Sequence, residues 1–315
     1  MIRKDKRMGA EETIAIRKRS AARRLAARSA APLLAISLLA PASARADDPP
    51  KTVEPEKPPP LFKVDPVADS VLIAAGLGFS GIDELILSTG EIAPQRPGST
   101  SNLLGIDRIA VTQTIDPHAT TYSNIGLGVA IGFAALDPIL SGLRDGPDAG
   151  LVDGVIYAES LSITLAITDI TKVAFRRPRP IAYKEQAALD AQYGGPSKSP
   201  SISDTDATLS FFSGHASIIA ATSATATYLA FMRSPGTWRP WVTLVAGTLL
   251  TTGVSYERVR AGAHFPTDVI AGALAGGCIG VLVPHLHRFD SSAHHLWVGA
   301  NAVEGGGQVT LGGLL

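Results

Sequence analysis

The sequence is poor in cysteine, in aromatic residues and in charge. Cys278 is the only cysteine among 315 residues, so an intramolecular disulfide is excluded in any compartment. Aromatic residues make up 6% and charged residues 18% of the chain, whereas hydrophobic residues make up 45%. Ala and Gly are abundant, a composition typical of closely packed helices in water or in lipid. We expect Cys278, which lies in an apolar run, to be a small buried residue.

Charge is balanced over the whole chain but unevenly distributed along it. Residues 1–46 hold 11 Lys and Arg against 3 Asp and Glu, which leaves 17 basic and 25 acidic residues in the remainder. The main body is therefore acidic, and this disfavours a general nucleic-acid-binding role.

The N-terminus has the three parts of a secretory signal. Basic residues come first, the apolar stretch 30–42 follows, and Ala44-Arg45-Ala46 offers small residues at both positions that determine cleavage. We predict a signal peptide over residues 1–46 and export to the cell envelope, with an uncleaved anchor or a disordered basic tail as alternatives. Residues 47–66, rich in Pro and charge, predict a linker.

Long apolar stretches occupy most of the remaining chain. Each is long for a strand and rich in Ala, Leu, Ile and Gly, which predicts an all-α bundle of about six main helices within residues 67–290. In the tail, residues 291–315, two short alternating segments flank three glycines and predict a small β-hairpin. The predicted helices cover residues 67–89, 122–142, 151–175, 209–232, 240–257 and 266–286.

Membrane association is expected, in part or in full. Stretches 209–232 and 267–283 are apolar enough to span a bilayer, but other stretches carry interior carboxylates. A charge inside lipid costs about 2.5–3.5 kcal/mol on insertion scales, so these carboxylates should not face lipid. If the signal is cleaved and the first three helices all span, the loop after the third faces the cytoplasm. A soluble bundle, or one in which an early helix does not span, avoids this conflict. The carboxylates in question are Asp83, Glu84, Asp137, Asp153, Glu159 and Asp169.

A basic segment ends the third predicted helix. Residues 172–180 read K-V-A-F-R-R-P-R-P, where the prolines end the helix. Lys172 and Arg179 are seven residues apart, about two helical turns, a spacing that allows both to lie on one side. Such a concentration of cations in an acidic body indicates an anion site. A basic flank that sets membrane topology is the alternative.

A Ser-Gly-His sequence opens the fourth predicted helix. Ser213 suits the N-cap, and Gly214 lets the backbone approach a ligand closely. The free N–H groups of the first turn would then bind an anion, with His215 at its mouth as a proton donor. An ordinary cap beside a surface histidine is the alternative.

The third segment joins the last two predicted helices. Pro266 fits the first turn of a helix, so His264 precedes that helix and Asp268 can reach back to it. A carboxylate on one imidazole nitrogen fixes the tautomer and leaves the other nitrogen as a nucleophile. Arg258 adds a permanent cation. A capped helix beside a surface arginine is the alternative.

Taken together, the three segments read K-x6-R-P, S-G-H and R-x5-H-x3-D, each at a helix end. Over residues 120–287 the chain resembles the type 2 phosphatidic acid phosphatase family, which shares a helical fold with bacterial acid phosphatases and vanadium haloperoxidases. Two positions depart from the usual pattern, because Phe212 stands where a Pro is common and Glu257 where a Ser is common. Neither change removes a reactive group, but a carboxylate at 257 puts the affinity for substrate in doubt.

The resemblance implies a phosphate cradle and no metal ion or other cofactor. Lys172, Arg179 and Arg258 would bind the phosphoryl oxygens and stabilise charge in the transition state. Ser213 and the Gly214 N–H would complete the cradle. Three fixed cations would then do what metal ions do in other phosphatases.

The resemblance also implies three catalytic residues. His264 would attack phosphorus and form a phosphohistidine, Asp268 would orient it, and His215 would protonate the leaving oxygen. The implied activity is hydrolysis of a phosphate mono- or diphosphate ester, most simply of a lipid, on the exported side of the membrane. The partners expected are a phosphorylated lipid or a small phosphate ester, and no nucleic acid.

Other functions stay open at this point. The same cradle holds vanadate in haloperoxidases, although a compact body without a second domain speaks against a halide site. An acceptor hydroxyl in place of water would make a phosphotransferase. A non-catalytic envelope scaffold would not need these groups together.

Two further segments have weaker signals. The polar, turn-rich loop 181–209 separates the first two motifs and is expected to be a lid or a disordered connection. A cluster of histidines near the C-terminus lacks clear partner carboxylates and is expected to lie on the surface. These histidines are His285, His287, His294 and His295.

Overall fold

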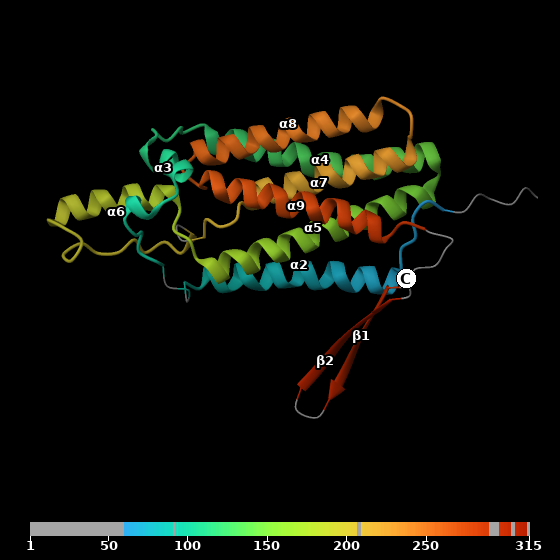
Figure 1. Ribbon diagram of the computed structural model, residues 1–315, viewed down its shortest axis with the longest axis horizontal. Coiled ribbons are helices and arrows are strands. Elements are labelled where there is room, and N and C mark those ends of the chain that lie inside the picture. The colour runs from blue at the N-terminus through green and yellow to red at the C-terminus, as the bar shows by residue number, and fades with distance from the viewer. Residues whose placement is uncertain are drawn as a thin grey trace, which may run out of the picture. The chain divides into compact units, whose positions relative to one another are not determined.

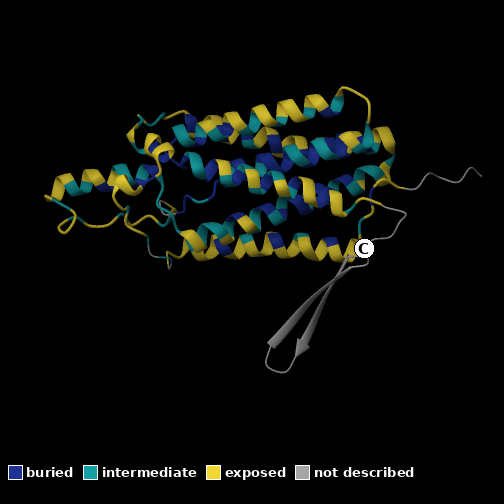
Figure 2. Ribbon diagram, in the orientation of Figure 1, coloured by how far each residue is buried: buried dark blue, intermediate teal, exposed yellow. Residues whose placement is uncertain are grey.

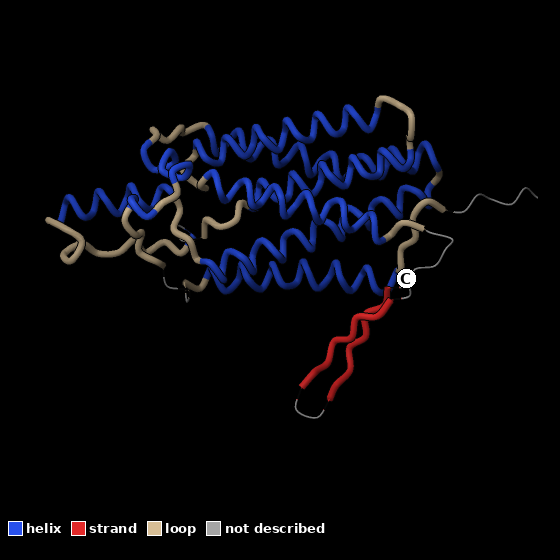
Figure 3. Tube along the Cα trace, in the orientation of Figure 1, coloured by secondary structure: helices blue, strands red, loops and turns tan. Residues whose placement is uncertain are grey.

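The computed structural model describes residues 60–90, 92, 94–206 and 209–289, and the backbone of residues 296–303 and 306–313. The predicted signal peptide and most of the predicted linker lie outside these residues. Helices dominate the described chain, as the blue tube in Figure 3 shows.

Six long helices run in alternating directions and form a bundle (Figure 1). They begin and end within about five residues of the predicted stretches, so the predicted all-α bundle of about six main helices is confirmed. The six are α2 (Pro66–Ser88), α4 (Ala119–Asp145), α5 (Pro147–Phe175), α7 (Gly214–Arg233), α8 (Arg239–Arg260) and α9 (Pro266–Leu286).

Three short helical elements were not expected from the apolar pattern. They are the 3₁₀ turn η1 (Thr100–Asn102), α3 (Gly105–Thr112) and α6 (Pro180–Tyr193). The prediction that residues 181–209 form a loop is therefore wrong for their first half. Pro180 stands at the first position of α6, and Gly194 ends the helix with a φ of 73°, so both caps were readable although the helix itself is polar.

The helix α7 lies at the centre of the bundle, in contact with α4, α5, α8 and α9. Its contact with α9 is close because α9 has a glycine at every fourth position, at Gly272, Gly276 and Gly280. A methyl group at Gly272 would lie 2.6 Å from the carbonyl oxygen of Ser213. The stripe of glycines thus allows the two backbones to touch.

Cys278 is exposed, so the prediction that it is buried is wrong. It lies two residues from both Gly276 and Gly280, about 200° around the helix from each. Because the glycines face α7, Cys278 points away from the bundle.

Two carboxylates within the long helices, Asp153 and Asp137, are buried against arginines. Asp153 in α5 receives Arg233 in a fork with N–O distances of 2.5–2.9 Å. Asp137 in α4 accepts from Arg239 at 2.8 Å and from the Tyr157 hydroxyl at 3.0 Å. As expected, these two charges are not presented to lipid, since both carboxylates are at most 3% exposed. Glu84 of α2 differs from the expectation, because it is exposed.

The outer faces of the helices are apolar and exposed (Figure 2). Among the described residues, four segments are long and apolar enough to cross a membrane: Pro66–Ser88, Ala119–Asp145, Pro147–Tyr193 and Pro266–Leu286. Exposed side chains such as Val71, Leu85 and Leu274 would contact water if the bundle were soluble. These features are those of a membrane protein.

The C-terminal residues form the predicted hairpin. The strands β1 (Leu296–Val303) and β2 (Gly306–Gly313) pair antiparallel, with Leu296 opposite Gly313 and Val303 opposite Gly306.

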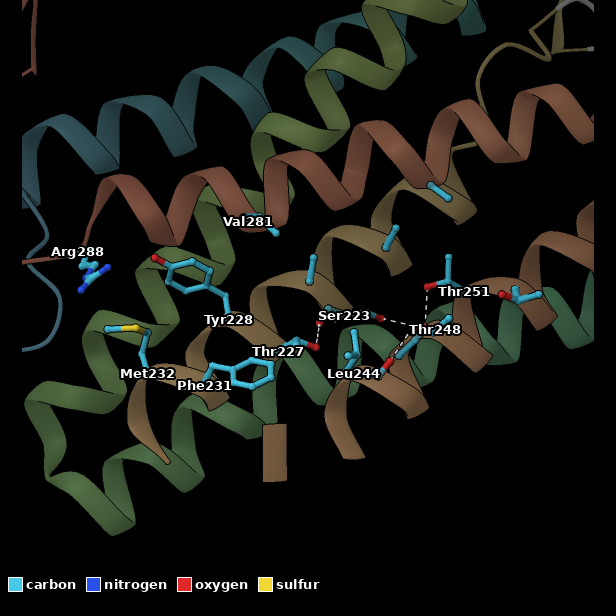
Figure 4. Close-up of a pocket in the computed structure, with 15 residues that line it drawn as sticks. Ser223, Thr227, Tyr228, Phe231, Met232, Leu244, Thr248, Thr251, Val281 and Arg288 are labelled. Carbon is cyan, nitrogen blue, oxygen red and sulfur yellow. Dashed lines mark hydrogen bonds between the residues drawn. The ribbon is translucent and has the colours of Figure 1, made fainter. Parts of the chain in front are cut away.

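A groove of about 710 Å³ runs between α7, α8 and α9 (Figure 4). Its lining is largely apolar, with the hydroxyls of Thr227, Thr248 and Thr251 bonded back to their own helices. None of the predicted site residues lines it, so the groove and the predicted site are different places.

Candidate active site

The three motifs meet at one end of the bundle. They lie at the C-terminal end of α5, the N-terminal end of α7 and the connection from α8 to α9. A methyl group built on Gly214 would lie 3.9 Å from Lys172 Nζ, which brings the first and second motifs together. Ser213 N donates to the backbone oxygen of Asp268 at 3.1 Å, which joins the second motif to the third.

Local sequence explains why α7 begins where it does. Ser213 is the N-cap, and its hydroxyl accepts from the N–H of Ala216 at 3.4 Å. Gly214 has no side chain between the first turn and Lys172. The start of this turn therefore lies close to a cation, and its backbone N–H groups together with Lys172 suit an anion at the helix N-terminus.

His264 is buried, at 2% exposure, in the turn between α8 and α9. Its Nδ1 lies 2.7 Å from the backbone oxygen of Ser210, and that carbonyl can only accept. The proton is therefore on Nδ1, and Nε2 carries the lone pair. Nε2 has no hydrogen-bond partner within the described part of the chain.

Asp268 does not hold His264 by a hydrogen bond, unlike the expectation from sequence. Its Oδ2 lies 4.0 Å from His264 Nδ1. Instead Oδ2 accepts from the Ser210 hydroxyl and, at 2.8 Å, from the N–H of Phe265. Asp268 thus holds Ser210 in place, and the Ser210 carbonyl orients the imidazole of His264. The effect of Asp268 on the orientation of the imidazole is therefore indirect.

Arg177 is the cation that faces Asp268. It donates to Asp268 Oδ1 at 2.5 Å and to Asp107 Oδ2 at 2.8 Å, and it stacks on Phe265 with 4.0 Å to the ring centre. Asp107 in turn accepts from the backbone N–H of Thr267 at 3.1 Å. This network fastens the start of α9 to α3 and to the chain that follows α5.

Three cations surround the two imidazoles. Burial, followed by the charges of Arg179, Arg258 and Lys172, lowers the pKa of His264 well below its usual value. Burial and the same three cations lower the pKa of His215 to about 4. Both imidazoles are therefore neutral near pH 7 without a bound anion. The cations and the imidazoles form a shared, positively charged site.

The guanidinium groups of Arg179 and Arg258 each donate one hydrogen bond and keep further N–H donors unused. Arg179 donates to Asp206 Oδ1 at 2.6 Å, and Arg258 donates to the Ser123 hydroxyl at 3.4 Å. The Nε atoms of both arginines are buried without a hydrogen-bond partner among the described residues. Unused buried donors that converge beside two imidazoles favour an oxyanion as the occupant.

Several residues of the site were not found from the sequence. The Oδ1 atom of Asn124 accepts from His215 Nε2 at 2.9 Å. Asn124 lies in a polar Thr-Thr-Tyr-Ser-Asn run that opens α4. Arg177 stood in the basic segment without a role. Ser210 and Asp107 gave no local signal, because they act through contacts 58 and 70 residues away along the chain.

Residues 153–291 match the family model described as the PAP2 superfamily. All eight predicted site residues lie within this range, so the predicted resemblance is confirmed, and the match supports a phosphatase of this superfamily. No curated protein matches the chain. Among solved structures the chain is similar to the first transmembrane PAP2 type phosphatidylglycerolphosphate phosphatase from Bacillus subtilis. The identity is 18%, the TM-score 0.39, and the match covers 69% of this chain and 94% of that one.

Proposed function

Because residues 153–291 match the model of the PAP2 superfamily, we propose that the protein is a phosphatase that transfers the phosphoryl group to His264 and then to water. One observation carries the proposal. The backbone oxygen of Ser210 takes the Nδ1 proton of a buried imidazole, so Nε2 is a free nucleophile beside three cations.

The cations would hold the phosphate. Lys172, Arg179 and Arg258 would pair with its oxygens, and the first turn of α7 after Ser213 would donate backbone N–H groups. Phosphoryl transfer needs positioning and charge neutralisation more than covalent help, and fixed cations supply both. The proposed chemistry therefore uses no metal ion.

The reaction would proceed in two steps. Nε2 of His264 attacks phosphorus as the ester P–O bond breaks, and His215 gives its proton to the leaving oxygen. Water then attacks the phosphohistidine, His215 takes a proton from this water, and inorganic phosphate leaves. The negative charge of the bound phosphate raises the pKa of His215 from about 4, which lets it act as the acid.

We propose a lipid phosphate as the substrate. Four segments of the described chain are able to cross a bilayer, and the site lies at one end of these helices. A site at the end of membrane-spanning helices would lie at the depth of the lipid headgroups.

We further propose that this end faces the exported side. The helices α2, α4 and α5 alternate, so the start of α2 lies at the end opposite to the site. The orientation therefore requires Lys63 on the cytoplasmic side. The 11 Lys and Arg of residues 1–46 favour this side by the positive-inside rule when these residues are retained and stretch 30–42 does not span the membrane. A cleaved signal with all three helices spanning would give the opposite orientation.

The orientation is tested with single cysteines. Cys278 is exposed and is first replaced by Ser, and Ser197→Cys (site end) or Thr237→Cys (opposite end) is then introduced. A membrane-impermeant thiol reagent added to intact cells with a permeabilised outer envelope should label only position 197. Labelling of position 237 alone would place the site on the cytoplasmic side.

The chemistry is tested with the purified full-length protein. Release of phosphate from a phosphorylated lipid should continue in EDTA, stop with His264→Ala and be inhibited by vanadate, which imitates the transition state. A lipid and a soluble monoester assayed side by side identify the substrate class. Full activity of His264→Ala contradicts the proposal, and bromide oxidation with vanadate and peroxide would show a haloperoxidase.

A further inference from the structure

A second cluster of reactive side chains lies at the opposite end of the bundle. His287, the C-cap of α9, faces Asp69 of α2 and Glu159 of α5. Its Nε2 lies 3.4 Å from Asp69 Oδ2 and 3.1 Å from Glu159 Oε2. Both carboxylates are buried, with exposures of 6% and 5%. The prediction that His287 lies on the surface without partner carboxylates is therefore wrong, since the partners come from distant helices.

The charge of this cluster is not balanced. Asp153 and Asp137, the other buried carboxylates at this end, each face an arginine. Here two carboxylates share one imidazole, which supplies at most one positive charge. A divalent ion in place of the imidazole proton would balance both carboxylates, and buried charge without compensation is costly.

The side chains are also oriented as ligands. The N–H at Nδ1 of His287 donates to the backbone oxygen of Val283 at 2.9 Å, which turns Nε2 towards the carboxylates. This outer hydrogen bond is characteristic of metal-bound histidines. Asp69 Oδ2 is fixed by the N–H of Asp65 at 2.8 Å. Glu159 Oε2 is buried without a hydrogen-bond donor aligned on it, although Nε2 is 3.1 Å away.

The spacing of the three atoms fits a transition-metal ion. Ligands about 2.0–2.1 Å from a tetrahedral Zn²⁺ lie roughly 3.3 Å from each other. The distances of 3.1 and 3.4 Å from Nε2 are close to that value, and all three atoms lie within 4.8 Å of one another. Water would complete the coordination, because only three ligands come from the described chain.

We propose that Asp69, Glu159 and His287 bind a divalent transition-metal ion, Zn²⁺ by preference, that fastens α2 to α5 and α9. The ion has a structural task. The buried residues of α2 are Asp69, Gly76 and Asp83, so this helix has little apolar surface against the bundle. Binding expels the Nε2 proton to solvent, since a donating nitrogen cannot ligate. The site goes beyond the proposed phosphatase chemistry and is independent of it.

The test uses the full-length protein in detergent, stripped with chelator and dialysed. Titration with Co²⁺ as a spectroscopic probe should give one ion per chain with visible ligand-field bands, and Zn²⁺ should displace it. Zn²⁺ at 100-fold excess over its Kd should raise the unfolding temperature by about 5–10 °C. Absence of a 1:1 complex at micromolar Co²⁺ would overturn the proposal without any variant.

Two variants separate this site from unspecific binding. Glu159→Gln keeps the shape and should weaken Co²⁺ binding at least tenfold. His285→Gln is the matched control, because His285 is bonded to the Tyr228 hydroxyl at 2.9 Å and should not affect binding. Equal affinity of Glu159→Gln and the unmutated protein, or an equal loss in the control, contradicts the site. Phosphate release assayed briefly in EDTA reports on the active site separately.

Discussion

The glycine stripe of α9 provides a direct test of how the site is held together. At Gly276 a methyl group would overlap the carbonyl oxygen of Ser217 and lie 2.6 Å from its carbonyl carbon and 2.8 Å from its Cα. At the neighbouring Gly277 nothing lies within 4 Å of the same atom. Gly276→Ala and Gly277→Ala therefore make the same chemical change on two sides of one helix.

The two variants should differ in stability. Both gain up to about 1 kcal/mol of helix propensity, so the difference between them isolates the overlap. Overpacking against backbone costs about 2–3 kcal/mol, since neither α7 nor α9 has a flexible side chain there that can move away. For a body of this size the unfolding temperature of Gly276→Ala should be about 4–12 °C below that of Gly277→Ala.

Thermal unfolding in one detergent at fixed protein concentration is the measurement. Activity is expected to fall as well in Gly276→Ala, because α7 and α9 carry Ser213 and Asp268 at their N-terminal ends, bonded to each other at 3.1 Å. Unfolding temperatures that agree within about 1 °C would refute the reasoning that backbone contact, rather than side-chain packing, joins these helices.

Three other predictions concern the site. Asp206→Asn should lower the KM for phosphate esters several-fold, because the carboxylate that occupies Arg179 at 2.6 Å competes with substrate; an unchanged KM contradicts this. The free energy of unfolding should fall as pH drops from about 6.5 to about 4, since His215 binds a proton when unfolded but not when folded, and this fall should be smaller in His215→Asn. Arg177→Met should lower the free energy of unfolding by about 3–5 kcal/mol, because it leaves the buried Asp107 and Asp268 without their cation. Denaturant unfolding measures this loss, and a loss under about 1 kcal/mol would contradict the role given to this ion-pair network.

Features of this molecule that depend on neighbouring residues could be predicted from the sequence, whereas features that depend on distant segments could not. The six long helices come from continuous apolar stretches and from local caps such as Ser213 and Pro266, so their positions were predictable. Lys172, Arg179 and His264 could be proposed as site residues because each motif is short and its chemistry is local. The sequence did not show which face of each helix packs against the bundle. Cys278 is an example, because it is exposed although its sequence neighbours are as apolar as those of a buried residue.

Contacts between distant segments could not be predicted either, because the local sequence does not show which residues the fold brings together. Asp69 and Glu159 are unremarkable helical carboxylates until the fold brings them to His287. The Ser210 carbonyl is a backbone group, which every residue has, so no pattern of residue types indicates that it holds the imidazole. The sequence predicts that Asp268 lies beside His264, and the structure agrees. It does not predict that the hydrogen-bond partner of the imidazole is the Ser210 carbonyl and not the Asp268 carboxylate.

This difference changes what Asp268 is expected to do. The Ser210 carbonyl already fixes the tautomer of His264, so the carboxylate is not needed for that. Its charge, 4.0 Å from Nδ1, acts when the imidazole becomes positive on attacking phosphorus. At an effective dielectric constant near 20, this attraction is worth about 4 kcal/mol before the opposing charge of Arg177 is counted.

Asp268→Asn keeps the size of the side chain and removes the charge. If the carboxylate stabilises the developing imidazolium, kcat should fall by about 10²–10³ while KM stays within about twofold, because the ground-state imidazole is neutral. If the carboxylate only holds Ser210 in place, Ser210→Ala should cost as much as Asp268→Asn. Steady-state kinetics of the two variants distinguish these roles, and equal losses would assign Asp268 to positioning alone.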